Sequence, residues 1–180
     1  MLQVALRVEI PSTHGDLITG YPGEQFGGSH PEQEPKSYRG ASVEVSVPLD
    51  RARETLDLLL ETVNQHPFVA PLAFRYVKNS KATLAFTQYA PTTVTIEMPG
   101  YDDPFNHAAR GHQAVFEALQ NSNIPHSYHW GQAFPDNKQW VINSYGTEKI
   151  AAWKQQRLQR LGEKGCYIFA NQLVASLGLA

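Results

Sequence analysis

Apolar and polar residues alternate along several stretches of this chain, and such alternation is the pattern of half-buried β-strands. It predicts strands over residues 2–10, 41–47, 72–77, 82–87 and 92–98. In the second of these stretches three valines share one face, whereas Glu44 and Ser46 lie on the other. The short polar breaks between the last three stretches are typical of an antiparallel meander.

Other stretches carry apolar residues at helical spacing. One helix is predicted to run from Asp50, its expected N-cap, to about Gln65. Its buried stripe should hold Leu56, Leu59, Leu60 and Val63. A second helix is predicted to begin at Asp103-Pro104, because proline suits the first helical turn. Its buried stripe should hold Phe105, Ala108, Ala109, His112, Val115, Phe116 and Leu119.

The last third of the chain predicts a short helix capped by Pro135-Asp136, a longer helix over residues 149–161 and a terminal apolar segment over residues 168–177. Strands grouped in one antiparallel sheet, with helices packed on one face, make the expected fold class α+β. The length suits a single domain over residues 1–180. Residues 11–39 form a polar stretch rich in glycine and proline, and so long a loop is either functional or an ordinary flexible excursion.

Composition narrows the class of protein. Apolar residues make up 42% of the chain, enough for a substantial core, and a pI near 6.4 with a net charge of −2 argues against binding to nucleic acid. No stretch approaches the roughly 18 consecutive apolar residues of a membrane helix. The start of the chain lacks the features of a signal peptide, and a single cysteine excludes an internal disulfide. We therefore expect a soluble cytoplasmic protein.

Arg75 is the first candidate for a functional residue. It alternates with Phe74 and Tyr76 and so points to the opposite face of its strand. A guanidinium on an inner strand is costly unless an anion, a carboxylate or a polyol hydroxyl meets it. Arg75 is therefore either part of a ligand site or an edge arginine paired with a nearby carboxylate. Glu97, on the next strand but one, could approach the same place or simply be exposed.

The second candidate is the loop His129-Trp130-Gly131-Gln132. A tryptophan supplies a flat wall, a glycine lets the backbone approach a planar ring, and a histidine donates or accepts near neutral pH. The other interpretation is an aromatic loop that packs on the sheet. Asn171, near the end of the chain, would either touch a bound ring system or cap a helix.

These motifs, in this order and spacing, resemble the C-terminal half of the FAD-linked aldonolactone and alditol oxidases of the vanillyl-alcohol-oxidase superfamily. In that family a strand carries Glu-x-Arg, a His-Trp-Gly-Lys loop faces the flavin, and the final segment contains Phe-x-Asn. This chain has Ala73-Phe74-Arg75, the loop ending in Gln132, and Phe169-Ala170-Asn171 in the corresponding places. The resemblance spans about residues 40–179.

The resemblance implies a cap-like, substrate-recognition domain for an FAD-dependent oxidoreductase that acts on CH–OH groups of a sugar lactone, polyol or similar alcohol. It implies catalytic roles for Arg75 and His129, and substrate- or flavin-facing roles for Trp130, Gly131, Gln132, Asn171 and Glu97. Clustered glycines that would hold a pyrophosphate at a strand-to-helix junction are missing, so FAD is expected from a separate domain or chain. The expected partners are that FAD-binding protein, a small alcohol or lactone, and a second copy in a homo-oligomer.

Two departures from the family pattern support a different function. Ala73 stands where the family has an acid, and Gln132 where it usually has a lysine. Alcohol oxidation requires a group that takes the hydroxyl proton, and alanine cannot do so. The alternative is a redox-inactive cap domain that binds a small molecule or a protein, and enzyme activity stays open. No metal site is expected, because His107 and His112 lie about 140° apart on a helix.

Overall fold

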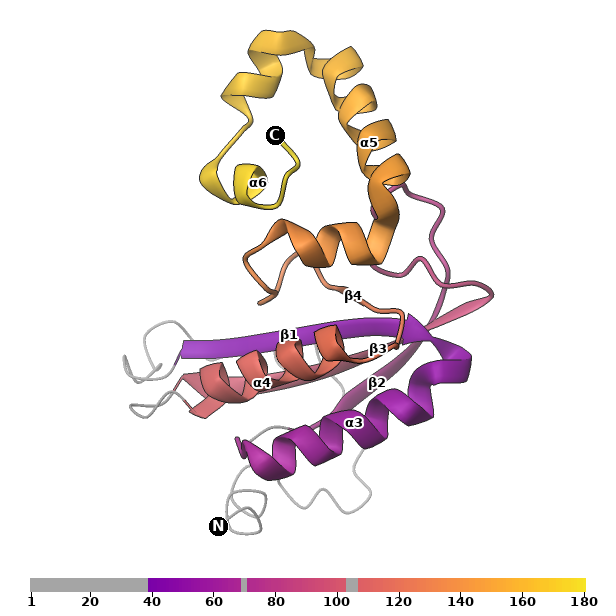
Figure 1. Cartoon of the computed structure of the whole chain (residues 1–180), viewed down its shortest axis with the longest axis vertical. Coiled ribbons are helices and arrows are strands. Elements are labelled where there is room, and N and C mark those ends of the chain that lie inside the picture. Colours follow the sequence, from indigo (N-terminus) through magenta and orange to yellow (C-terminus); the bar gives the residue numbers. More distant parts are fainter. Residues whose placement is uncertain (1–38, 69–70, 103–106) are drawn as a thin grey trace, which may run out of the picture.

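The computed structural model describes residues 39–68, 71–102 and 107–180 (Figure 1). The predicted strand over residues 2–10, the loop over residues 11–39 except Arg39, the predicted helix start at Asp103-Pro104, and Phe105 lie outside these residues. The elements in chain order are β1 (Arg39–Pro48), the 3-10 turn η1 (Leu49–Arg51), α3 (Ala52–Gln65), β2 (Ala73–Lys78), β3 (Thr92–Asp102), α4 (His107–Asn121), β4 (Ser127–Tyr128), α5 (Lys138–Ile168) and α6 (Gln172–Ser176).

The four strands form one antiparallel sheet in the order β2-β3-β1-β4. With one helix between β1 and β2 and another between β3 and β4, this order is the split βαβ arrangement of ferredoxin-like folds. Figure 1 shows α3 and α4 alongside the sheet. The predicted α+β class is confirmed. None of the helices in the described part of the chain is long and apolar enough to cross a membrane.

The core lies between the sheet and these two helices. Alternate residues of β1 and β3 are fully buried there, and they pair across the strands as Val43 with Met98, Val45 with Ile96 and Val47 with Val94. The helices contribute Leu59, Val115 and Leu119, which are also fully buried. Each such side chain stabilises the fold by about 1.5–3 kcal/mol through removal of apolar surface from water. The valine face of β1 predicted from the alternation is therefore the core face.

The start and the buried stripe of α3 differ from the prediction. Arg51 precedes the first residue of the helix, Asp50 lies in the 3-10 turn, and no side chain caps α3. Leu59 is buried as predicted, but Leu60 is 45% exposed. Thr55 and Thr62 are buried instead. Each threonine hydroxyl donates to the carbonyl four residues earlier at 2.8 Å, so a polar side chain can replace an apolar one there.

A similar correction holds for α4, where Ala109 is exposed and Gly111 is buried. A Cβ on Gly111 would lie 2.2 Å from Cδ1 of Phe68, so only glycine fits against that ring. The ring of Phe68 packs against the helix backbone at Gly111, so the buried side of α4 includes Gly111 and not Ala109.

The predicted strand over residues 82–87 is wrong, because this segment is a series of turns between β2 and β3. Two of its carbonyls accept backbone amides within the turns, from Ala85 to Ala82 at 3.2 Å and from Ser80 to Thr87 at 2.7 Å, and two others accept side chains of distant segments. The carbonyl of Leu84 accepts the indole N–H of Trp130 at 2.8 Å, and that of Phe86 accepts the hydroxyls of Ser46 and Ser127. The segment therefore covers the sheet face opposite the helices.

Helix α5 consists of three helical pieces, because Gly146 and Gly162 interrupt it with φ values of +75° and +64°. The middle piece contains the predicted helix over residues 149–161. Asn137 caps the first piece, in place of the predicted Pro135-Asp136, by accepting the amides of Gln139 and Trp140. We call residues 147–176 the lobe, since Figure 1 shows them extending away from the sheet.

Candidate functional site

The second face of the sheet carries a charged cluster built by three strands. Glu44 on β1 lies directly opposite Glu97 on β3, and Arg75 projects from β2 onto the same face. Arg75 donates from Nη1 to Oε1 of Glu44 at 2.7 Å and from Nη2 to Oε2 of Glu97 at 2.5 Å. We call these three side chains the carboxylate–guanidinium cluster. One guanidinium holds two carboxylates, so the cluster carries a net charge of −1.

The three members of the cluster differ in their exposure. The side chain of Glu44 is 8% exposed and that of Glu97 is 20% exposed, whereas Arg75 is 50% exposed. Carboxylates placed opposite one another in neighbouring strands repel, and a shared guanidinium offsets that repulsion. The buried acids therefore depend on an arginine that is open to solvent and to any ligand on this face.

Two neutral residues complete the surroundings of Glu97. Oε1 of Glu97 accepts the hydroxyl of Ser42 and the amide of Gln132, each at 3.1 Å. The amide oxygen of Gln132 is buried, and no described residue donates a hydrogen bond to it. A buried acceptor without a donor is costly, and a ligand hydroxyl is one group that would satisfy it.

The pKa values follow from these contacts. Burial by itself acts to raise the pKa of Glu97, but the hydrogen bonds from Arg75, Ser42 and Gln132 and the charge of Arg75 outweigh it and lower that pKa. The hydrogen bond to Glu97 and the charge of Glu44 raise the pKa of Arg75, against the effect of burial. Both groups are therefore ionised at neutral pH.

The loop that contains His129 and Gln132 is held against β1 by its backbone. The amide of His129 donates to the carbonyl of Glu44, and the amide of Ala133 donates to that of Ser42, both at 2.9 Å. The ring of His129 meets Phe86 edge-on at 4.6 Å, and its Nδ1 accepts the amide of Gly131 at 3.0 Å. That acceptor role leaves the proton of the neutral ring on Nε2.

Gly131 allows this arrangement because of the space it leaves. A Cβ on Gly131 would lie 3.0 Å from Cε1 of His129, which is tighter than ordinary contact. The glycine therefore permits its own amide to reach the imidazole. The close approach that we predicted for this glycine is thus made to a side chain of the same chain.

Trp130 and Asn171 lie apart from the cluster. The indole of Trp130 stacks on Tyr145 at 5.8 Å between ring centroids, and it packs against Trp140 at 4.9 Å. This contact belongs to the aromatic group that joins α5 to the sheet. Asn171 caps α6, where its side chain accepts the amide of Val174 at 2.8 Å. Both placements correspond to the structural interpretations that we set beside the functional ones.

Of the residues singled out from the sequence, Arg75, Glu97 and Gln132 meet directly, and His129 joins them through the backbone of Glu44. Glu44 itself was not singled out. Its position on the polar face of β1 was visible in the alternation, but its pairing with Arg75 depends on strand register.

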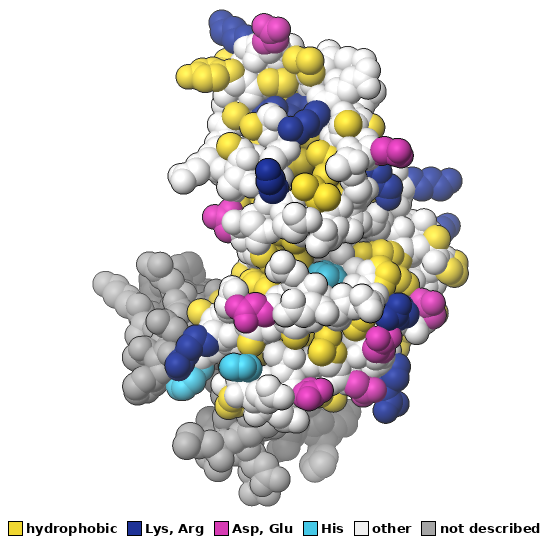
Figure 2. Space-filling model, in the orientation of Figure 1, with side chains coloured by type: hydrophobic (Ala, Val, Ile, Leu, Met, Phe, Trp, Pro, Cys, Tyr) yellow, Lys and Arg dark blue, Asp and Glu magenta, His cyan; other side chains and the backbone are white. Residues whose placement is uncertain are grey.

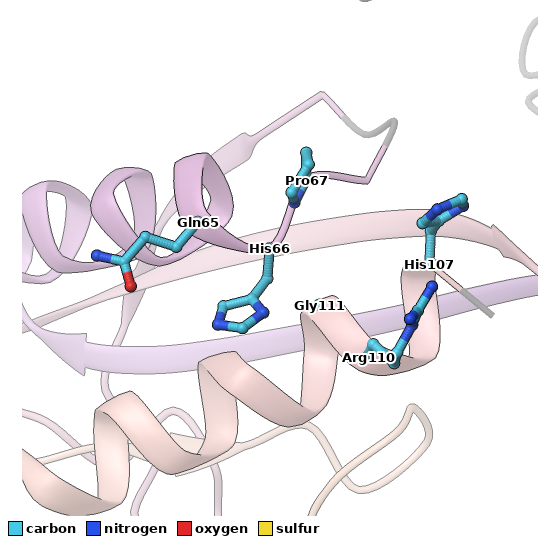
Figure 3. A pocket seen from close by; sticks show the side chains of 6 residues that line it. All are labelled: Gln65, His66, Pro67, His107, Arg110 and Gly111. Carbon is cyan, nitrogen blue, oxygen red and sulfur yellow. The ribbon is translucent and has the colours of Figure 1, made fainter. Parts of the chain in front are cut away.

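A separate hollow of about 260 Å³ lies on the helix side of the sheet (Figure 3). It is lined by the end of α3, the start of α4 and two residues that follow α3, namely Gln65, His66, Pro67, His107, Arg110 and Gly111. None of the residues to which the resemblance assigns a role lines it, although His107, which we weighed as a metal ligand, does. No group of three or more His, Cys, Asp or Glu side chains in the described part of the chain could hold a metal ion.

Comparisons with known proteins add little to this picture. No family description matches the chain, and no curated protein matches it. Among solved structures, a "De novo designed protein Foldit4" is similar over 51% of this chain and 97% of its own, with 13% sequence identity and a TM-score of 0.29. A likeness at this level carries no information on function. What the fold and the cluster define is an α+β domain with a polar, partly open site on the sheet face away from its helices.

Proposed function

We propose that this chain is the substrate-recognition domain of an FAD-dependent oxidoreductase that acts on CH–OH groups of a neutral polyol or sugar lactone. The flavin would be supplied by a separate domain or chain. The observation that carries the proposal is the meeting of Arg75, Glu97 and Gln132 on one sheet face, beside the His129 loop. These residues belong to the motifs that resemble the flavin-facing side of the oxidase family.

The charge of the site supports a neutral, hydroxyl-rich substrate. A cluster with a net charge of −1 repels anions, whereas carboxylate oxygens and the amide oxygen of Gln132 accept hydrogen bonds from hydroxyls. The half-exposed guanidinium retains N–H groups that can donate to a hydroxyl or lactone oxygen. A sugar lactone or polyol matches this mixture of donors and acceptors better than a carboxylate or phosphate.

Glu97 supplies an answer to the missing acid of the family pattern. It lies directly opposite Ala73 in the register of β2 and β3, so its carboxylate occupies the sheet face next to that position. It is ionised at neutral pH and can therefore accept a hydroxyl proton, and its lowered pKa makes it a weaker base than a free glutamate, so a bound flavin would have to supply most of the driving force. The flavin, when bound, would accept the hydride. In this proposal Glu97 takes the proton, and Arg75 and Gln132 orient the hydroxyls.

The residues fit a domain that faces a flavin but does not hold one. A dinucleotide needs converging backbone amides for its pyrophosphate, usually from clustered glycines at the start of a helix. In the described part of the chain, Asn137 and Asn171 cap α5 and α6 with their own side chains, and neither helix begins with clustered glycines. The described residues offer substrate contacts only.

The experiment has two parts. Calorimetric titration of the chain with neutral aldonolactones and polyols, and with the matching carboxylates, should show binding of the neutral compounds alone. The chain is then mixed anaerobically with the separate flavin-domain protein and a compound that binds. This mixture should bleach the absorbance of the oxidised flavin. Glu97→Gln should abolish the bleaching but keep the binding, whereas the exposed control Glu61→Gln should change neither. Absence of both binding and bleaching for every compound would refute the proposal.

A second candidate function is a redox-inactive module that binds a small molecule or a protein. One observation favours it: the chain's own carboxylates already pair both terminal nitrogens of Arg75. Neutral residues at Ala73 and Gln132 point the same way. Binding of a neutral compound without any flavin bleaching, and without an effect of Glu97→Gln, would establish this function in place of the first.

A further inference from the structure

The lobe exposes large apolar side chains that the described residues do not cover. Figure 2 shows hydrophobic side chains at the surface of this part of the protein. Three consecutive residues are exposed: Tyr167 by 85%, Ile168 by 58% and Phe169 by 67%. The full set of exposed large apolar residues in the lobe is Leu158, Leu161, Tyr167, Ile168, Phe169 and Leu173.

This exposure belongs to a well-defined structure. Within the lobe Arg157 donates from Nη2 to the carbonyl of Cys166 at 2.7 Å, and Asn171 caps α6. Beyond it Leu177 and Leu179 are buried in the main core, so the chain is anchored on both sides of the lobe. Large apolar patches on an ordered surface mark interaction sites.

The summed exposed area of these six side chains approaches that of a stable contact. At about 200 Å² for each fully exposed large side chain, the six residues present roughly 700 Å². A standard interface buries about 800 Å² on each partner. A pair of such contacts, related by a twofold axis, would exceed that requirement.

Charge indicates what covers the patch. Residues 147–176 contain five basic and two acidic side chains, a net charge of +3, whereas the rest of the chain contains ten basic and fifteen acidic ones, a net charge of −5. Two lobes would repel each other, but a lobe would attract the remainder of another copy. The lobe therefore complements the body of a second molecule in sign.

The body also offers an exposed apolar surface. On β2, Phe74 and Tyr76 are 38% and 71% exposed, and on α3, Leu60 is 45% exposed. Asp57 and Glu61 lie on either side of Leu60 along the helix, and α3 has a net charge of −2. We call Leu60, Phe74 and Tyr76 with these two acids the α3–β2 face.

We propose that the chain forms a twofold dimer in which the lobe of each copy packs on the α3–β2 face of the other. The contact is reciprocal, so each interface combines a basic apolar lobe with an acidic apolar face. This assembly does not depend on the proposed function, because the carboxylate–guanidinium cluster lies on the opposite face of the sheet from Phe74 and Tyr76.

Sedimentation of the purified chain tests the dimer. The wild type should be dimeric at micromolar concentration, and Tyr167→Ser with Phe169→Ser should weaken the dimer at least about thirtyfold. Both side chains are exposed, so the far-UV circular dichroism should be unchanged, and any fall in melting temperature should be confined to concentrations at which the wild type is dimeric. A wild-type chain that stays monomeric at its highest soluble concentration overturns the proposal.

A charge exchange tests which surfaces meet. Arg160→Glu with Lys164→Glu reverses the lobe, and Asp57→Lys with Glu61→Lys reverses the α3–β2 face. Each variant alone should be monomeric, because lobe and face then carry like charges. An equimolar mixture of the two should dimerise, because both contacts then join opposite charges. If the second variant alone dimerises as well as the wild type, the contact is not with this face and the proposal fails.

A membrane surface is the other occupant that a basic apolar patch would suit. Flotation with vesicles of phosphatidylcholine and phosphatidylserine distinguishes it. A monomer that binds these vesicles through Tyr167 and Phe169 would refute the dimer and assign the lobe to a lipid surface.

Discussion

Nη1 of Arg75 lies 2.7 Å from Oε1 of Glu44, and the two residues come from strands that are not neighbours in the sheet. The guanidinium reaches across β3 to a carboxylate that is almost fully buried. Glu97, on the strand between them, accepts a hydrogen bond from Nη2 of the same guanidinium. One half-exposed side chain thus holds two acids, and that relationship leads to the first two predictions.

Arg75→Met should destabilise the fold by about 1–3 kcal/mol, because a buried carboxylate that loses its partner keeps its desolvation cost. The exposure of Arg75 keeps the effect below that of a fully buried pair. Chemical denaturation measures the loss. Arg75→Met combined with Glu44→Gln should recover part of it, whereas the exposed control Lys81→Met should be neutral. Equal stability of Arg75→Met and wild type would show that the cluster is not a structural element.

The lowered pKa of Glu97 predicts acid sensitivity of the unfolding free energy. The folded-state pKa of Glu97 lies below the ordinary value of about 4.3. Its contribution to the unfolding free energy is therefore complete above that value and is lost as the pH falls through the folded-state pKa. Glu97→Gln should therefore flatten the profile below about pH 4.3. A profile of unchanged slope in this variant would assign the acid sensitivity to other carboxylates.

The buried His112 and the partly buried His126 predict a further pH dependence of the unfolding free energy, at higher pH. Burial lowers the pKa of His112 and of His126, against the backbone hydrogen bonds to Met98 and Ile124. The unfolded chain then binds protons more readily than the folded chain. The contribution of these histidines to the unfolding free energy is therefore complete above the ordinary pKa of about 6.5 and falls as the pH drops below it. His112→Gln, which can still donate to the Met98 carbonyl, should reduce this slope between about pH 7 and pH 5.

Gly111→Ala should destabilise the protein by about 1–3 kcal/mol through overpacking. The new Cβ would meet the Phe68 ring at 2.2 Å, so the ring or the helix must move. Gly146→Ala provides a comparison, because its Cβ would meet nothing and only its φ of +75° is unfavourable. Thermal melting of both single variants separates crowding from backbone strain. The double variant Gly111→Ala with Phe68→Leu removes the ring that the new Cβ would meet, so it should regain stability relative to Gly111→Ala. If relief of the ring does not restore stability, crowding is not the cause.

The alternation of side chains along a strand is a local property, and it predicted the core face of β1 correctly. Because successive residues point to opposite faces, Glu44 had to lie away from Val43 and Val45 whatever the rest of the chain does. The same local reasoning failed for residues 82–87, where the carbonyl of Phe86 accepts two serine hydroxyls. Those serines come from β1 and β4, and no local pattern records them.

The sequence by itself determined the α+β class, the valine face of the sheet and the side of the strand from which Arg75 projects. Only the tertiary structure decided that Arg75 meets Glu44 and Glu97, that Trp130 stacks on Tyr145, and that the described residues leave apolar side chains of the lobe exposed. The reason is physical. Periodicity and propensity act between residues a few positions apart, whereas strand register and packing depend on the free energy of the whole fold.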